Sequence, residues 1–425
     1  MGLSESDIDA ARHANRMRVL IVGEFFPWPA WGGGLMRLAN SVEALSALGE
    51  ADLFTLSPRN RDLPLELPPE IRVNRLKVAL YPKIPSRARW QVEWLRKRGI
   101  PRDVVKRSLD HSARSEFEDW TADSYDLVWF STAALFGWMG RPHLGPTIVD
   151  FVDLEDEKAS RRTRVMTPAN APRGLIHQLR RRASLAQENR NVRDWSQYQR
   201  SVASEVDRVT LCSDRDVVRS GLTNAVVIPN SYPRPAEAMG HSHVADPPVV
   251  LFQGTLAYKP NTDAANWLVT KIAPRIWESD PSVTVRLAGT PIPEVEALHN
   301  PPSVTVVGRV PSMERELSIA DIALVPIRFG SGTRVKILES FAHRVPVVST
   351  TIGVEGFDLI DGVHLFIADD PAAFATACHR LLTEPTLRSS MVDAAEQWYL
   401  ERHEGSVSRK RLQALAREVA SSGTG

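Results

Sequence analysis

The segment with the most residues suited to chemistry is GSGTRVKILE, which runs from Gly330 to Glu339. Glycines let the backbone approach a ligand, and a helix expected to begin near Thr333 would present unpaired N–H groups to an anion. Arg334 and Lys336 add positive charge, and Glu339 could accept hydrogen bonds from a pair of hydroxyl groups such as those of a ribose. These features suit a diphosphate joined to a ribose, as in a sugar nucleotide. The loop residues expected to contact it are Ser331, Gly332 and Thr333.

Further positions in the same half suit the same ligand. Gly254 ends a candidate strand, and Lys259 follows in the loop GTLAYKPN, where its charge could neutralise a phosphate. Gly308 ends another candidate strand, and the backbone groups of Arg309 and Val310 after it could contact the edge of a base. Taken singly, each residue could equally serve as a helix cap, a turn or a surface charge. The prediction of a binding site depends on their combination.

The amino-terminal half contains a second set of candidates. Its first strand leads into GEFFPWPAWGGG, where Gly33 and Gly34 would let the loop approach a bound sugar and Trp31 could form an apolar wall or pack inside. The glycines do not spell the dinucleotide fingerprint, so an NAD site is not expected. Asp150 and Asp153, in DFVDLED, could hold sugar hydroxyls or assist proton transfer, or could instead cap a helix.

The elements that position these residues indicate an α/β protein. Short β-branched runs alternate with longer helical segments, the pattern of parallel sheets covered by helices. Candidate strands lie at 18–25, 51–58, 126–131, 146–153, 208–213 and 225–230, and then at 248–255, 284–290, 303–310, 322–327, 346–350 and 362–369. The sequence therefore predicts two doubly wound, Rossmann-like domains whose crevices face each other across a cleft.

The expected division has three parts. Residues 17–235 form an acceptor-binding domain, residues 236–395 a nucleotide-sugar-binding domain, and residues 396–425 a helix that packs back toward the first domain. A Pro, Ala and His-rich stretch, 231–248, serves as the linker between the two domains.

Composition restricts the setting of the protein. The chain has 425 residues, a net charge of +1 and two widely separated cysteines, Cys212 and Cys378, without the spacing of a metal site. No apolar run is long enough for a membrane span, and the start lacks a signal peptide pattern. We expect a cytoplasmic protein that does not bind nucleic acid. Two Arg-rich stretches, 59–120 and 158–200, could be solvated faces or could contact an acceptor or the inner face of a membrane.

The order of these motifs resembles that of retaining glycosyltransferases with the GT-B fold, specifically family 4, over most of residues 17–395. The similar segments are AVVIPN, GTLAYKPN, VTVVGRV and GTRVKILESFAHRVPVVST followed by Gly353. DFVDLEDEKAS together with GTRVKILE also looks like a branch of bacterial sugar transferases associated with exopolysaccharide assembly.

This resemblance implies a role for each matching residue. Glu339 would bind the donor ribose, and Arg309 and Val310 would contact the base through their backbone. The diphosphate would be surrounded by Lys259, Arg334 and Lys336. The implied reaction moves a sugar, with retention, from a nucleotide diphosphate sugar to a hydroxyl of a sugar, lipid-linked or small-molecule acceptor, and requires no metal and no cofactor. Its products would be glycans, exopolysaccharides or glycosylated natural products.

Two positions depart from the family pattern. Ser331 lies eight residues before Glu339, where the family often has a first glutamate, and Thr255 replaces an arginine after the glycine of the first strand. The missing glutamate leaves the identity of the sugar open. Three alternatives stay open: a sugar-nucleotide epimerase, a hydrolase, and a non-catalytic nucleotide-sugar-binding protein, the last of which Ser331 favours.

Overall fold

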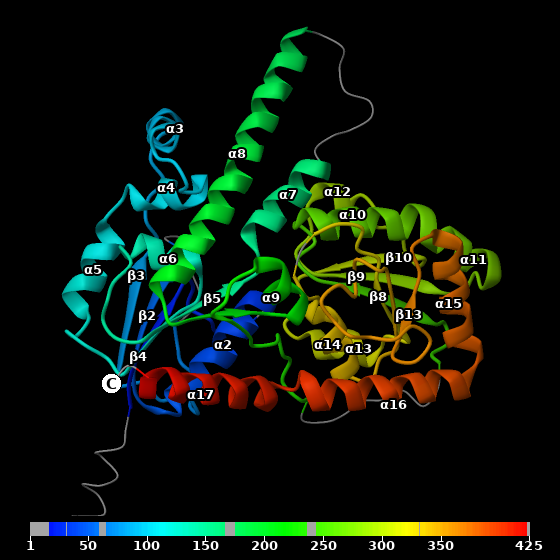
Figure 1. Cartoon of the computed structure of the whole chain (residues 1–425). Coiled ribbons are helices and arrows are strands. Elements are labelled where there is room, and N and C mark those ends of the chain that lie inside the picture. The colour runs from blue at the N-terminus through cyan, green and yellow to red at the C-terminus, as the bar shows by residue number, and fades with distance from the viewer. Residues whose placement is uncertain are drawn as a thin grey trace, which may run out of the picture. The chain divides into compact units, whose positions relative to one another are not determined.

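The computed structural model describes residues 17–30, 32–58, 65–165, 175–235, 244–330 and 332–422. The chain divides into two compact units: Met1–Ile228 together with Arg409–Gly425, and Pro229–Ser408. Each unit contains one parallel sheet accompanied by helices (Figure 1). The predicted α/β class, with two Rossmann-like sheets, is confirmed.

The first unit is built on a seven-stranded sheet of order β3-β2-β1-β4-β5-β6-β7. Its central strands are buried on both faces, which explains their continuous runs of Val, Leu, Ile and Phe. The strand order reverses between β1 and β4, and this is the switch point where ligands bind in such sheets. The strands are β1 (Met17–Gly23), β2 (Gly49–Ser57), β3 (Arg75–Leu80), β4 (Leu127–Phe130), β5 (Thr147–Val152), β6 (Arg208–Leu211) and β7 (Ala225–Val227). The helices are α2 (Gly33–Ser46), α3 (Arg87–Arg96), α4 (Arg102–Ser108), α5 (Ser112–Trp120), α6 (Ala133–Trp138), α7 (Glu155–Val165), α8 (Leu175–Glu205) and α9 (Asp214–Ser220).

The second unit has a six-stranded parallel sheet of order β10-β9-β8-β11-β12-β13, with its switch point between β8 and β11. The strands are β8 (Val249–Gln253), β9 (Thr284–Ala288), β10 (Val304–Gly308), β11 (Ile322–Val325), β12 (Val347–Ser349) and β13 (Phe366–Ile367). The helices are α10 (Lys259–Trp267), the π-helical turn η1 (Leu268–Ile272), α11 (Ala273–Ser279), α12 (Pro293–Glu296), α13 (Met313–Ser318), α14 (Val335–Ala342), α15 (Pro371–Thr383) and α16 (Pro385–Arg402).

The last helix, α17 (Gly405–Ser422), returns to the first unit, as predicted. Within that unit Arg409 donates to the Asn40 side chain at 2.8 Å, and Gln413 donates to the Ala44 carbonyl at 2.9 Å, both on α2. Its apolar residues join the core beneath the sheet: Leu412, Leu415, Ala416 and Val419. Among the described residues, no helix combines the length and apolarity that crossing a bilayer requires.

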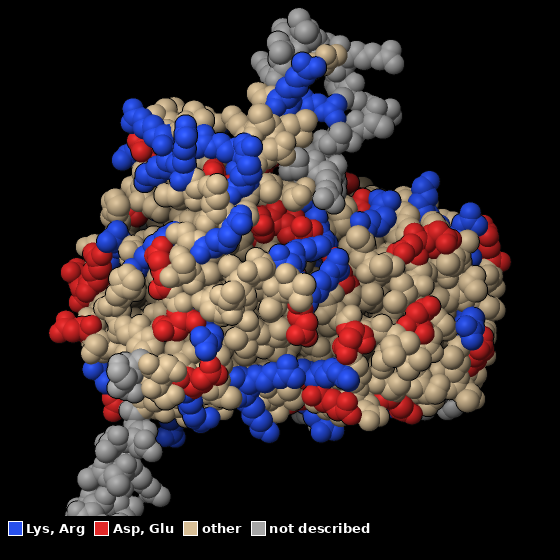
Figure 2. Space-filling view, in the orientation of Figure 1, with Lys and Arg blue, Asp and Glu red and all other residues tan. Residues whose placement is uncertain are grey.

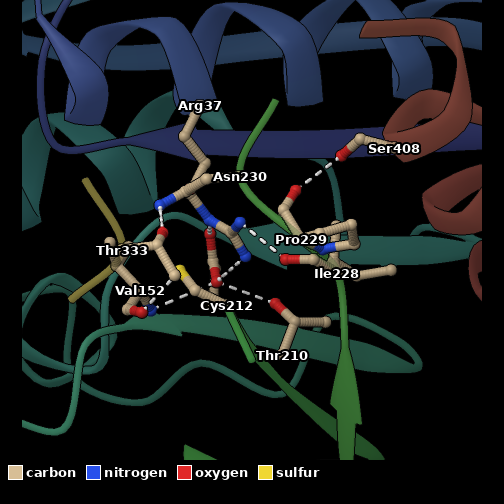
Figure 3. A network of polar contacts seen from close by, with 10 residues as sticks. Arg37, Val152, Thr210, Cys212, Ile228, Pro229, Asn230, Thr333 and Ser408 are labelled. Carbon is tan, nitrogen blue, oxygen red and sulfur yellow. Dashed lines mark hydrogen bonds and ion pairs between the residues drawn. The ribbon is translucent and has the colours of Figure 1, made fainter. Parts of the chain in front are cut away.

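The chain passes from the first unit to the second after Ile228 and returns after Ser408. Hydrogen bonds hold the carbonyl groups of Ile228 and Pro229 at the first of these crossings. The Ile228 carbonyl accepts a hydrogen bond from Arg37 of the first unit at 2.7 Å. The next carbonyl, that of Pro229, accepts one from the Ser408 hydroxyl of the second unit at 2.9 Å (Figure 3). Entry to and exit from the second unit therefore lie next to each other.

Candidate functional site

Three glycines form the carboxyl edge of the second sheet at neighbouring strands. Gly254, Gly289 and Gly308 end β8, β9 and β10 with φ of 139°, 135° and 79°. The Gly254 N–H donates to Ala288 at 2.9 Å, and the Gly289 N–H donates to Gly308 at 2.8 Å. A Cβ on Gly289 would lie 1.7 Å from the Gly254 carbonyl oxygen, so only glycine fits there. At Gly308 nothing lies within 4 Å of the Cβ position, so the backbone is open there.

Two helices begin beside this glycine edge, at the switch point of the sheet. Helix α10 follows β8 and α14 follows β11, and these two strands are neighbours. Helix α14 starts at Val335, two residues later than expected, with Arg334 as an N-cap that makes no side-chain capping bond. The first N–H groups of the helix and its positive dipole end favour an anion here.

Lys336 occupies the first turn of α14. Its Nζ donates to Oδ1 of Asn261 at 3.0 Å and lies 4.2 Å from the centre of the Phe252 ring. A Cβ placed on Gly254 would be 3.1 Å from this Nζ, so the ammonium group points at the glycine edge. Burial, together with the charge of Arg334, lowers the pKa of Lys336 from 10.5 to about 7. A nearby anion would favour its charged form.

Arg334 and the start of α10 meet at Gly330. A Cβ on Gly330, whose φ is 125°, would lie 2.9 Å from Nη2 of Arg334 and 3.4 Å from Cγ of Pro260. Lys259, just before Pro260, is exposed at the first position of α10. The structure therefore brings Arg334 and Lys336 to the helix start that carries Lys259, all within the second unit.

Glu339 lies one turn after Lys336 and is 9% exposed. Burial raises the pKa of its carboxyl group to about 7, while hydrogen bonds from Gln253 and Tyr232 and the charge of Lys336 act in the opposite direction. A carboxylate and an ammonium group are thus both buried beside the glycine edge, and each ionises with difficulty in the unliganded protein.

The other residues predicted to bind the donor belong to the same unit. Thr333 accepts a hydrogen bond from Asn230 at 2.6 Å, and Gly332 has a φ of 78°. Arg309 is exposed and Val310 half-buried, directly after β10. Ser331 lies outside the described residues.

Sequence reasoning missed several contacts of this site. Gly289 could have been predicted from the sequence, because it ends the predicted strand in RLAGT just as Gly254 and Gly308 end theirs. Asn261, Gln253 and Tyr232 carried no local signal, since their contacts with Lys336 and Glu339 come from distant segments.

The first unit has its own polar group at the end of β1, which sequence reasoning also missed. The two carboxylate oxygens of Glu24 accept hydrogen bonds from the Tyr81 hydroxyl at 3.0 Å and from Thr132 at 3.1 Å. The Glu24 N–H donates to Ser131 at 2.8 Å, across the switch point between β1 and β4. Burial raises the pKa of Glu24, as does the charge of Glu155.

The predicted residues of the first unit have different environments. Gly33 and Gly34 form the start of α2, and Trp31 lies outside the described residues. Asp150 is 2% exposed, and its carboxylate pairs with the Arg37 guanidinium at 2.6 and 2.8 Å and accepts from Thr210 at 2.8 Å (Figure 3). Contrary to expectation, this carboxylate is not open to sugar hydroxyls, because the buried pair occupies it.

Asp153 follows a strained turn. Val152 has a φ of 58°, which a β-branched residue rarely adopts, and its carbonyl accepts from the Cys212 thiol at 2.7 Å. Asp153 itself is half-buried. Strain of this kind is often kept where a loop must present a functional side chain.

Comparisons with known proteins point to a family for the second unit. Residues 247–384 match the family model "Glycosyl transferases group 1", so the match covers the glycine edge, Lys336 and Glu339. A stretch of 136 residues is 28% identical to an "Uncharacterized 44.6 kDa protein in cps region" of Klebsiella pneumoniae, covering 30% of this chain and about a third (35%) of that relative's length.

Solved structures show the same fold across the whole chain. Sucrose-phosphate synthase from Thermosynechococcus elongatus matches with a TM-score of 0.66 at 16% identity, over 96% of this chain and 100% of that one. The Anabaena protein HepE, solved in complex with UDP and glucose, matches with a TM-score of 0.62 at 12% identity, over 95% and 100%. Residues 247–384 therefore form a domain of the group 1 glycosyltransferase kind, and the two parallel Rossmann-like sheets show that the chain has the GT-B fold.

Proposed function

We propose that the chain transfers a sugar from a UDP-sugar to an acceptor hydroxyl, with retention of configuration. One observation carries this proposal: Arg334, Lys336 and Glu339 are gathered at the switch point of the second sheet, beside an edge of bare glycine backbone. A diphosphate matches the cations and the helix start, and a ribose matches the carboxylate. UDP is chosen because HepE, of similar fold, was solved with UDP and glucose.

The same cations would act on the reaction as well as on binding. When the sugar leaves, negative charge builds on the diphosphate, and groups that are already in place stabilise it without reorganisation. The pKa of Lys336 is lowered to about 7, and an anion beside its Nζ would raise this pKa and hold the proton. The charge would therefore be fully present when the leaving group needs it.

The other residues have supporting roles in this proposal. Lys259 would contact the diphosphate, and the backbone groups of Arg309 and Val310 would contact the base. Gly33 and Gly34 would approach the acceptor, and Asp153 would assist its deprotonation. The similarity to a protein of a cps region favours a glycan or exopolysaccharide acceptor. A cytoplasmic setting stays a prediction.

The first test measures donor binding. Isothermal titration with UDP, ADP, GDP and their glucose conjugates should show a preference for the UDP compounds, and Arg334→Ala should weaken it strongly. Arg315→Ala is the matched control, because Arg315 is exposed in the same unit. Equal affinity of the Arg334 variant and the wild type would remove this residue from the site.

The second test separates the possible reactions. Once an acceptor is found, Arg334→Ala should lower turnover by about a hundredfold or more, as expected for a lost contact to a developing anion. A sugar isomer formed without an acceptor would instead indicate an epimerase, and free sugar released at full speed a hydrolase. Donor binding without turnover on any acceptor would indicate a non-catalytic binding protein.

A further inference from the structure

Helix α3 has one anchored face, which contacts α8 in the same unit. Trp94 is 2% exposed and donates from Nε1 to Asp194 at 2.9 Å. The Arg190 guanidinium lies 4.7 Å from the Trp94 ring and donates to the Lys97 carbonyl at 2.8 Å. These contacts fix which side of α3 turns toward solvent.

The solvent side of α3 carries an apolar stripe. Ala88, Val92 and Leu95 are spaced i, i+4 and i+7, which places them on one face of a helix. All three are exposed, Val92 at 46% and Leu95 at 61%. Ile84, just before the helix, is 53% exposed. Moving these apolar side chains from water into an apolar medium is favourable in free energy, so the stripe is suited to such a medium.

Cations flank this stripe on both sides. Each residue of a helix is rotated by about 100° from the one before it. This rotation places Arg87 on one side of the stripe and Arg89 and Arg96 on the other. Figure 2 shows Lys and Arg side chains gathered over α3 and α4, at the upper left. The exposed cations of residues 83–98 are Lys83, Arg87, Arg89, Arg96, Lys97 and Arg98, against one acidic residue, Glu93.

The cationic surface continues into a hollow behind the helix. Lys97 and Arg98 line a cavity of about 570 Å³; Arg114 and Arg141 also line it, but they are paired with Glu118 and Glu205. A surface with an apolar stripe, flanking arginines and a cationic hollow complements an interface that is apolar beneath and anionic above. A bilayer of acidic phospholipids has this profile.

We propose that α3 and the segment that follows it dock the protein on an anionic bilayer, with Val92 and Leu95 in the acyl boundary and the flanking arginines at the phosphates. The helix has ten residues, so it would lie in the interface. This inference does not depend on sugar transfer, and its test uses no donor or acceptor.

The test is co-sedimentation of the full chain with vesicles. The wild type should pellet with phosphatidylcholine vesicles that contain phosphatidylglycerol, but not with phosphatidylcholine alone, and 1 M salt should release it because the Debye length falls to about 3 Å. Val92→Asp with Leu95→Asp should abolish pelleting. Val218→Asp is the control, because Val218 is 81% exposed on α9, outside this surface.

The charge contribution is tested separately. Replacing Arg87, Arg89 and Arg96 by Gln should weaken partitioning about a hundredfold, at about fivefold per cation. The same change in net charge at Lys271, Arg275 and Arg315, all exposed in the second unit, should have a much smaller effect. Thermal melting confirms that each variant is folded.

Three outcomes would overturn the proposal. The wild type could fail to pellet with the anionic vesicles, or the variant with Asp at 92 and 95 could pellet as the wild type does. Gel filtration could instead show a dimer that Leu95→Asp dissociates, which would assign the stripe to a second copy of the chain.

Discussion

Replacing Lys336 by Met should stabilise the unliganded protein while removing donor binding. The folded protein lowers the pKa of Lys336 from 10.5 to about 7, which corresponds to about 5 kcal/mol of disfavoured charge at about 1.4 kcal/mol per pKa unit. Methionine keeps the length of the side chain and removes that charge. Relaxation and water near the ammonium group reduce the gain.

Two losses act against this stabilisation. Asn261 loses the donor to its Oδ1, which costs about 1 kcal/mol, and the contact of the ammonium group with the Phe252 ring is worth about another 1 kcal/mol. We therefore expect a net gain of about 1–2 kcal/mol, or about 3–6 °C in Tm. Differential scanning fluorimetry measures the shift, and isothermal titration with UDP measures the lost affinity.

The pH dependence gives a sharper check. Below about pH 7 the lysine is protonated in both the folded and the unfolded wild type, so the full penalty is present. Between pH 7 and 10.5 the unfolded state binds more protons, so the stability of the wild type rises with pH. The advantage of Lys336→Met should therefore shrink across this range.

Lys271→Met is the matched control, because Lys271 is exposed on η1, and it should leave both Tm and UDP affinity near the wild-type values. A lower Tm of Lys336→Met at pH 7 would show that burial does not penalise the ammonium group, and wild-type affinity for UDP would show that Lys336 does not bind the donor.

Three further variants test other parts of the structure. Glu339→Gln should bind UDP at least tenfold more weakly. The folded protein raises the pKa of Glu339 from 4.5 to about 7, so the wild type loses stability as pH rises through this range. Fluorimetry should show a smaller loss of stability in the variant. Gly289→Ala should lower the free energy of unfolding by more than about 2 kcal/mol in urea titrations, because its Cβ would overlap the Gly254 carbonyl, whereas Gly34→Ala, with open space around it, should not. Asp150→Ala should cost about 3–5 kcal/mol in the same titration, since it removes the carboxylate that balances the buried Arg37 charge, and a loss under 1 kcal/mol would contradict this account.

The part of the proposed site that lies on α14 was predictable because its signal is local. Gly330 to Glu339 lie in one stretch of sequence, and a loop of small residues before an amphipathic helix is readable without any tertiary information. The fold was predictable for a similar reason, since buried parallel strands appear as continuous apolar runs.

What could not be predicted depends on contacts between distant segments. The Glu24 carboxylate is fixed by Tyr81, which follows β3, and by Thr132, which follows β4. Both strands lie close to β1 in the sheet but far from it in the sequence. Asp150 looked available because the sequence does not reveal that Arg37, 113 positions away, pairs with it. Strand β3, RLKVAL, was missed because it is an edge strand whose charged residues interrupt the apolar run.

The adjacent carbonyls of Ile228 and Pro229 are held by different units, and Ser408, at the return of the chain, holds the second of them. A block of sequence whose two ends meet in this way can be swapped between relatives with only two splice points. Chimaeras that replace residues 229–408 of this chain by the corresponding unit of a relative would need no new linker. If residues 229–408 bind the sugar nucleotide, as proposed, such a chimaera would change the donor and keep the first unit unaltered.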